Sequence, residues 1–401
     1  MGLFESNKRI IFCLVGILMV LSHLSPVNAK SNEEIYQEKL DQLKPDDMDG
    51  YYKLGLWCKQ NKLLEQAKIQ FSKVLELDPK HKKARQDLES IIQSEKDAKI
   101  AEIIKKYGFY KGVLDKPGAD SEKLPWEKAR EKETEHLIVK TNLSVDALND
   151  LCCLLECAYF HYQDLFSCEQ PQGEKLRVMV TKNKDDYQKI YYDVTGTNSS
   201  PSNRGNFIPA SFPGNKSGQN YLLSFYDPSL QLLLTFALLH ECTHYAMFLL
   251  GQKYCCSQPP IWFNEGWATY CEASRLEGKR LVANCINQKR FPFIKDAINK
   301  RTYIKLKDFI NCSAAEYNNV YYPEGWSLVY FLVNGQGGKY KTGLQSYMEA
   351  WKKNKIAMSG EGTGDYSPQD KPGHLKLFEE CMSVPIDKLE KEWEEYILQL
   401  K

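Results

Sequence analysis

The stretch "ALLHECTHYAMFLL", residues 237–250, decides how this sequence is interpreted. It holds two of the seven histidines, His240 and His244, four residues apart, and Glu241 directly follows the first. Four residues are close to one helical turn, so both imidazoles share a face if the segment is helical. Two such imidazoles can bind one zinc ion, and a glutamate rotated by about 100° can lie beside the metal as a general base.

The same stretch also fits a buried structural helix. It is surrounded by apolar residues, namely Leu232, Leu233, Leu234, Phe236, Leu238, Leu239, Phe248 and Leu249. Asp227 and Pro228 predict the start of the helix, and Gly251 predicts its end. Burying two histidines and a glutamate costs free energy unless a metal or hydrogen bonds compensate. The motif alone therefore leaves both interpretations open.

A second segment, "PPIWFNEGWATYCEASRLEG" (259–278), favours the metal. It predicts another helix, which opens at Pro260 and ends near Gly278. Glu265 follows His244 by 21 residues, which is enough for the first helix to end and a second to bring back a carboxylate. Two histidines and one glutamate would leave the fourth zinc position open for water.

Together, "HECTH" and "WFNEGWATY" resemble the gluzincin zinc metallopeptidases. The similarity is greatest to the peptidase MA-like domains of secreted bacterial proteins, and more distant to aminopeptidase N and thermolysin. It covers roughly residues 134–400 and implies a thermolysin-like fold. It also implies that His240, His244 and Glu265 bind Zn²⁺ and that Glu241 is the catalytic base.

A third segment, "VYYPEGWSLVYFL" (320–332), resembles the gluzincin pattern Tyr-x-x-Gly before an apolar helix. The resemblance implies that Tyr322, three residues before Gly325, donates a hydrogen bond to the developing oxyanion. Tyr321 is the second choice for this role. The alternative is that both tyrosines only pack against or cap the helix.

Two departures from the family pattern narrow the expected activity. Thermolysin-like enzymes carry an acidic residue where this chain has Thr269, and Glu272 is the residue here that can support a ligand histidine. The Gly-x-Met-Glu-Asn strand of aminopeptidases is missing, so an endopeptidase is favoured. "NYLLSFYD" (220–227) can be an edge strand that pairs with an extended substrate, or it can be fully paired within the sheet.

The N-terminus has the pattern of a secretory signal peptide, residues 1–29. Lys8 and Arg9 precede an apolar run from residue 10 to 21, which is short for a membrane span of about 20 residues. We therefore expect a secreted or periplasmic protein with no stable membrane span after cleavage. Export permits disulfides, but Cys153 and Cys157 can be core thiols as well as a local bridge.

Residues 31–112 form a predicted helical module. The spacing of a single tetratricopeptide-like repeat is carried by Tyr51, Leu54, Gly55, Cys58, Ala67, Phe71, Val74 and Pro79. One repeat is too short for a long peptide groove, so the module is interpreted either as a packing appendage or as a site for a protein partner. A polar stretch at 113–133 is the predicted linker, and residues 134–401 are the predicted peptidase domain.

The predicted fold of the second domain is α+β, a small sheet followed by a helical lobe with the zinc cleft between them. Strands are expected at 136–142, 175–181, 206–212 and 220–226, and helices at 145–166 and near the C-terminus. The near balance of 53 basic and 52 acidic residues, without a long basic run, argues against nucleic-acid binding.

Two functions are compatible with these patterns. The first is a secreted zinc metallopeptidase that hydrolyses peptide bonds with metal-activated water. The alternative is a partner-binding protein that uses the helical module and keeps a zinc domain of little or no activity. The intact base and ligands favour the first. An intramembrane protease is disfavoured, because such enzymes need several apolar spans and only the signal segment has that character.

Overall fold

The computed structural model describes residues 30–108, 110–116, 119, 124–229, 233–254, 259–277, 280–353 and 371–401. The predicted signal segment, 1–29, lies outside them. The chain divides into one compact unit that ends at Glu95 and a second unit, Lys96–Lys401. The division falls inside helix α5 (Lys82–Tyr107), because the last turns of α5 bury Ile100, Ile104 and Tyr107 in the core of the second unit.

Consecutive helices build the first unit: α2 (Asn32–Leu40), α3 (Met48–Gln60) and α4 (Leu64–Leu77). Helices α3 and α4 pack closely, since a Cβ at Gly55 would come within 2.7 Å of the Phe71 ring. Cys58, Ala67, Phe71 and Val74 are fully buried between them. These small and large residues therefore lie in the seam between the two helices.

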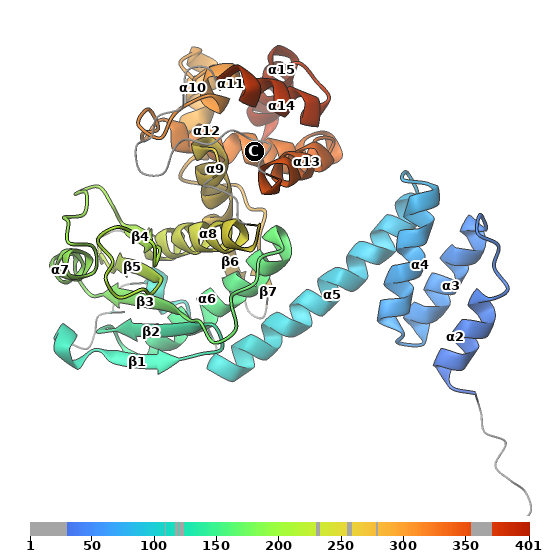
Figure 1. The fold of residues 1–401 in the computed structure, drawn as a ribbon, viewed down its shortest axis with the longest axis horizontal. Helices are drawn as coiled ribbons and strands as arrows, with labels where there is room; N and C mark the ends of the chain where they lie inside the picture. Colours follow the sequence, from blue (N-terminus) through green and yellow to red (C-terminus); the bar gives the residue numbers. More distant parts are fainter. Residues whose placement is uncertain are drawn as a thin grey trace, which may run out of the picture. The chain divides into compact units, whose positions relative to one another are not determined.

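The second unit contains a five-stranded sheet in the order β1-β2-β3-β5-β4 (Figure 1). The strands are β1 (Arg130–Glu133), β2 (Leu137–Thr141), β3 (Leu176–Thr181), β4 (Gly205–Ile208) and β5 (Tyr221–Phe225). Strands β2, β3 and β5 are parallel, and β1 and β4 are antiparallel edges. The four expected strands are all present. The fifth, β1, lies in the expected linker, where its charged sequence "REKE" gave no strand signal.

Two alternatives were open for the strand at 220–227, an edge strand and a strand fully paired within the sheet. Strand β5 pairs with β3 on one side and β4 on the other, so the fully paired alternative is correct. All five of its residues are buried, which explains its continuous apolar sequence. Among the described strands, β4 is the last one on this side of the sheet.

Helices fill the rest of the second unit. Two of them flank the parallel strands, α6 (Val145–Phe166) and α7 (Lys184–Thr195). The others are α8 (Leu233–Tyr254), α9 (Ile261–Cys271), α10 (Phe291–Lys300), α11 (Leu306–Ile310), α12 (Tyr321–Asn334), α13 (Lys341–Lys352), α14 (Lys371–Met382) and α15 (Ile386–Gln399), with a short hairpin of β6 (Arg275–Glu277) and β7 (Arg280–Val282). The unit is thus α+β, as predicted, with a small mixed sheet and a helical lobe (Figure 1).

Some predicted helix ends differ from the observed ones. Helix α8 continues past Gly251 to Tyr254. Before the helix, the Asp227 side chain accepts hydrogen bonds from the backbone and side chain of Ser229 in a local turn. Helix α9 stops at Cys271, well before residue 278, because the chain turns there into strand β6. Both errors follow from terminal signals, which locate helix ends only to within a few residues.

Two smaller expectations are settled within the described residues. None of the helices described is both long enough and apolar enough to cross a membrane. Cys153 and Cys157 are buried free thiols in α6, so the core-thiol alternative holds and the local bridge does not form.

Candidate metal centre

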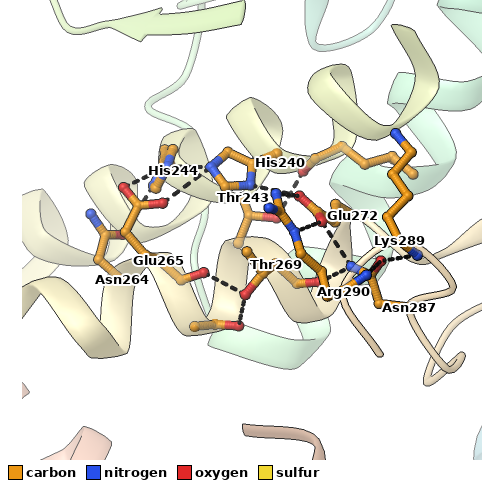
Figure 2. Close-up of polar contacts among 12 residues, drawn as sticks. His240, Thr243, His244, Asn264, Glu265, Thr269, Glu272, Asn287, Lys289 and Arg290 are labelled. Carbon is orange, nitrogen blue, oxygen red and sulfur yellow. Dashed lines mark hydrogen bonds and ion pairs between the residues drawn. The ribbon is translucent and has the colours of Figure 1, made fainter. Parts of the chain in front are cut away.

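Three side chains converge where helices α8 and α9 cross (Figure 2). The ligand atoms of His240, His244 and Glu265 all lie within 4.8 Å of one another. The two imidazole Nε2 atoms are 3.1 Å apart. Glu265 Oε2 lies 3.2 Å from the Nε2 atom of His240, and Glu265 Oε1 lies 3.5 Å from the Nε2 atom of His244. The helical spacing of the histidines and the return of α9 after a loop therefore bring together the residues expected as ligands.

The hydrogen bonds at Nδ1, the ring nitrogen of each histidine that faces away from Glu265, determine which nitrogen carries the lone pair. Nδ1 of His240 is 3.0 Å from an oxygen of Glu272, and Nδ1 of His244 is 3.1 Å from the Asn264 side-chain oxygen. Both oxygens are acceptors, so each Nδ1 carries the proton in the neutral ring. Each Nε2 then points a lone pair at Glu265. In that tautomer the three groups present only acceptors to one another, an arrangement that either a proton or a metal ion can satisfy.

Glu272 is itself held in place by a second layer of contacts (Figure 2). Its carboxylate accepts hydrogen bonds from Asn287 Nδ2 at 2.7 Å and Arg290 Nε at 2.9 Å. Burial raises the pKa of Glu272, but His240 and Arg290 outweigh burial and lower it to about 2. Glu272 thus stays ionised and holds the His240 ring by its Nδ1 proton.

Without any ion, a proton on the histidines supplies the positive charge between these groups. Burial lowers the pKa of His240, yet Glu265 and Glu272 outweigh it and raise the pKa to about 10. The same effect of nearby carboxylates raises the pKa of His244 against burial. Burial raises the pKa of Glu265, and the neighbouring histidines bring it well below its usual range. The carboxylates at this cluster therefore stabilise positive charge on or between the two histidines.

Glu241 lies beside this cluster, on the side of the sheet edge. Its Oε2 accepts a hydrogen bond of 2.7 Å from the backbone N–H of Phe207 in β4. A Cβ at Gly205, in the same strand, would come within 3.0 Å of the Glu241 Cγ atom. A larger residue at 205 would therefore press on Glu241, and the edge strand and this carboxylate form one surface.

Tyr322 lies in the first turn of α12 and faces the histidines. Its ring centroid is 6.1 Å from that of His240, and the Arg290 guanidinium carbon lies 5.0 Å from the Tyr322 ring. Burial, together with the charges of Glu265 and Glu241, raises the Tyr322 pKa far above its ordinary value. Tyr321 instead stacks on Phe309 at 5.9 Å and does not line the cleft. The structure thus places Tyr322, and not Tyr321, near the cluster.

Two glycines bring α9 and α12 into backbone contact. A Cβ at Gly266 would lie 3.2 Å from the Gly325 carbonyl oxygen, and one at Gly325 would lie 3.2 Å from the Gly266 Cα. Gly266 directly follows Glu265, and Gly325 comes three residues after Tyr322. The glycine of the Tyr-x-x-Gly pattern is therefore a packing residue that sets the position of Tyr322 relative to Glu265.

A cleft of about 820 Å³ opens onto the cluster. The cleft is lined by His240, Glu241, Glu272, Arg290 and Tyr322, along with Gly205 of β4, residues of α10 and the segment 302–304. It lies between the sheet edge and the helical lobe, as the sequence predicts. Its size suits a ligand of several heavy atoms or a short stretch of peptide.

Several of the supporting residues carry no signal in the sequence. Asn264 adjoins Glu265 in the chain, but nothing marks it as the partner of His244. Asn287 and Arg290 come from the loop before α10, where no local pattern indicates a contact with Glu272. Glu272 was expected to support a histidine and does contact His240. Thr269 donates only to helix backbone carbonyls, at 2.8 Å to that of Glu265.

Comparison with known proteins gives one partial match. Residues 235–350 match the model of a family described as a protein of unknown function, DUF1570. The matched region runs from α8 through α12 and most of α13, and it contains the histidines, both glutamates that contact them, Arg290 and Tyr322. No curated protein matches the chain significantly. The similarity therefore points to the same segment as the site geometry, without naming an activity.

Proposed function

We propose that this protein is an exported zinc metallopeptidase that acts as an endopeptidase. The observation that carries the proposal is the convergence of two imidazole lone pairs and a carboxylate, with the outer nitrogens of both rings held by acceptors. Two nitrogens and one carboxylate are a preferred donor set of catalytic zinc, and the buried Glu265 Oε2 points at His240 Nε2, 3.2 Å away, with no hydrogen bond to any other described residue.

In this proposal His240, His244 and Glu265 hold the ion. Zinc bound there would acidify a water molecule and polarise the substrate carbonyl. Glu272 and Asn264 keep the two rings in the tautomer that exposes Nε2. Arg290 keeps Glu272 ionised and in place.

The chain's own groups would move the protons. Glu241 accepts the proton of the attacking water on one carboxylate oxygen while Phe207 N–H holds the other, and it then passes that proton to the leaving amine. The Tyr322 hydroxyl donates a hydrogen bond to the oxygen on which negative charge develops. Its raised pKa keeps the phenol protonated and able to donate at neutral pH.

The preference for an endopeptidase rests on strand β4. This strand is the sheet edge beside Glu241, so an extended peptide can lie along it and continue past the cleft in both directions. The export signal expected at residues 1–29 would bring the enzyme to substrates outside the cytoplasm.

The first test is the zinc content of the purified protein, measured by mass spectrometry of the metal. We expect about one zinc per chain in the parent and a large loss in Glu265→Gln, which removes the ligand charge but keeps the side-chain shape. Glu277→Gln is the matched control, because Glu277 lies on β6 with a side chain 55% exposed. A parent protein that takes up no zinc, even from added metal, would contradict the proposal.

The second part of the test is hydrolysis of a mixture of internally quenched peptides. Glu241→Gln should keep its zinc and lose activity, because only the base is removed. If the parent binds zinc but cleaves no peptide, the activity is wrong and the partner-binding alternative remains.

A further inference from the structure

A second carboxyl lines the cleft without a partner for one of its oxygens. Glu324, in the first turn of α12, is 1% exposed. Its Oε2 accepts a hydrogen bond from the Ile304 backbone N–H at 3.1 Å, and its Oε1 makes none. The other carboxyls that the described cleft presents, Glu241 and Glu272, both have partners and belong to the metal centre.

The surroundings of Glu324 are largely apolar. The cleft wall near it includes Ile294, Ala297, Ile304, Val320 and Pro323. At the rim, Phe293 and Val320 are large apolar side chains that are 70% and 65% exposed. Burial raises the Glu324 pKa to about 8, even though the Ile304 N–H lowers it. A buried acid with an unused oxygen is costly, and a ligand that enters the cleft can supply the missing partner.

Helix geometry separates this carboxyl from the catalytic groups. Residues two apart on a helix point about 200° apart, so Tyr322 and Glu324 face different parts of the cleft. Tyr322 faces His240 and Arg290, whereas Glu324 faces the segment that contains Ile304. Glu324 and the catalytic groups therefore face different parts of the cleft.

We propose that Glu324 recognises a basic side chain of the substrate, a lysine or arginine close to the bond that is cleaved. The apolar wall fits the aliphatic stem of such a side chain, and the carboxylate accepts from its cationic end. Two cations along the cleft form ion pairs with other carboxylates, Arg290 with Glu272 and Arg204 with Asp227, and not with Glu324. This inference rests on the proposed peptidase function and adds a substrate class to it.

The test compares peptides that differ at one position only, with lysine or its uncharged analogue norleucine. In the parent protein we expect kcat/KM to favour lysine by about tenfold to a hundredfold at one position, the range of a buried charge-assisted hydrogen bond. In Glu324→Gln and in Glu324→Met the ratio of kcat/KM for the lysine peptide to that for the norleucine peptide should fall to about one. Both variants remove the carboxylate charge, one with a polar and one with an apolar side chain of similar length. Glu380→Gln, on an α14 side chain 61% exposed, is the control that keeps the ratio.

Several outcomes would overturn the subsite. One is a lysine to norleucine ratio near one in the parent, and another is a ratio that survives in both Glu324 variants. If Glu324 were a neutral acid that donates to a peptide carbonyl, the variants would slow both peptides equally and leave the ratio unchanged.

Binding separates this inference from the proposed activity. Fluorescence anisotropy of labelled peptides on the Glu241→Gln variant measures recognition without turnover. If no peptide is cleaved by the zinc-loaded parent, the peptidase proposal fails, and tighter binding of the lysine peptide that is lost with Glu324→Gln still supports the subsite. Equal binding of both peptides, or no binding, overturns it.

Discussion

Metal binding by this protein should release a proton, because His240 holds one far more tightly than an ordinary histidine does. Its pKa is raised to about 10 by Glu265 and Glu272, against the effect of burial. Nε2 must lose that proton to bind a metal. At pH 7, about three units below this pKa, deprotonation costs about 4 kcal/mol and weakens zinc binding about a thousandfold relative to a pH above 10.

Zinc affinity should rise with pH up to the pKa of His240, because the charged imidazole is the state that competes with the metal. Between pH 7 and 8.5, the logarithm of the association constant should rise by about one unit per pH unit. The rise should be steeper where His244, whose pKa is also raised, is still protonated.

The assay is competition with a chelator of known zinc affinity at each pH. Calorimetry in two buffers of different ionisation heat counts the released protons directly. Glu272→Gln is the matched variant, because it removes one of the two carboxylates that raise the His240 pKa and should reduce the slope. An affinity that is flat above pH 7 would contradict this prediction, since it would mean that His240 has an ordinary pKa near 6.5.

Two further predictions concern helix α12. Tyr322→Phe should lower kcat by about a hundredfold, the effect of losing one oxyanion donor, with zinc content unchanged, and an unaltered kcat would exclude that role. Gly325→Ala should destabilise the protein by about 1–3 kcal/mol, because its Cβ would lie 2.8 Å from the Tyr317 hydroxyl and 3.2 Å from the Gly266 Cα. Thermal or urea unfolding measures this, and Tyr317→Phe in the same chain should restore part of the loss by removing the hydroxyl; full tolerance of the alanine would show that the helices can separate.

The arrangement of the core of this site follows from local sequence. His240 and His244 meet because their spacing matches a helical turn, and Glu265 reaches them because 21 residues are enough to turn the chain back. Four of the five strands of the small sheet were also predictable, and the charged β1 was not. These signals depend on residues close together in the chain, which is where sequence patterns are informative.

The supports of the site could not be predicted in the same way. Arg290 reaches Glu272 only because the hairpin and loop between them fold back onto α9, a contact that no periodicity encodes. The Phe207 N–H meets Glu241 because β4, and not β5, lies at the sheet edge. The order of strands in a sheet depends on the crossover connections between them. The sequence of a strand alone therefore does not show whether it lies at the edge or beside the edge strand.

The contact between Gly266 and Gly325 has a consequence for how the site responds to metal. Glu265 and Tyr322 are carried by two helices that touch through their backbones, so the spacing of those helices is set by main-chain atoms that have no rotamers to change. The backbone positions of Glu265 and Tyr322 are thus fixed relative to each other, and the adjustment to an arriving ion falls on side-chain torsions. Of these side chains, the two imidazole rings are already held by Glu272 and Asn264, so the carboxylate of Glu265 is the ligand with the most freedom to turn toward the ion.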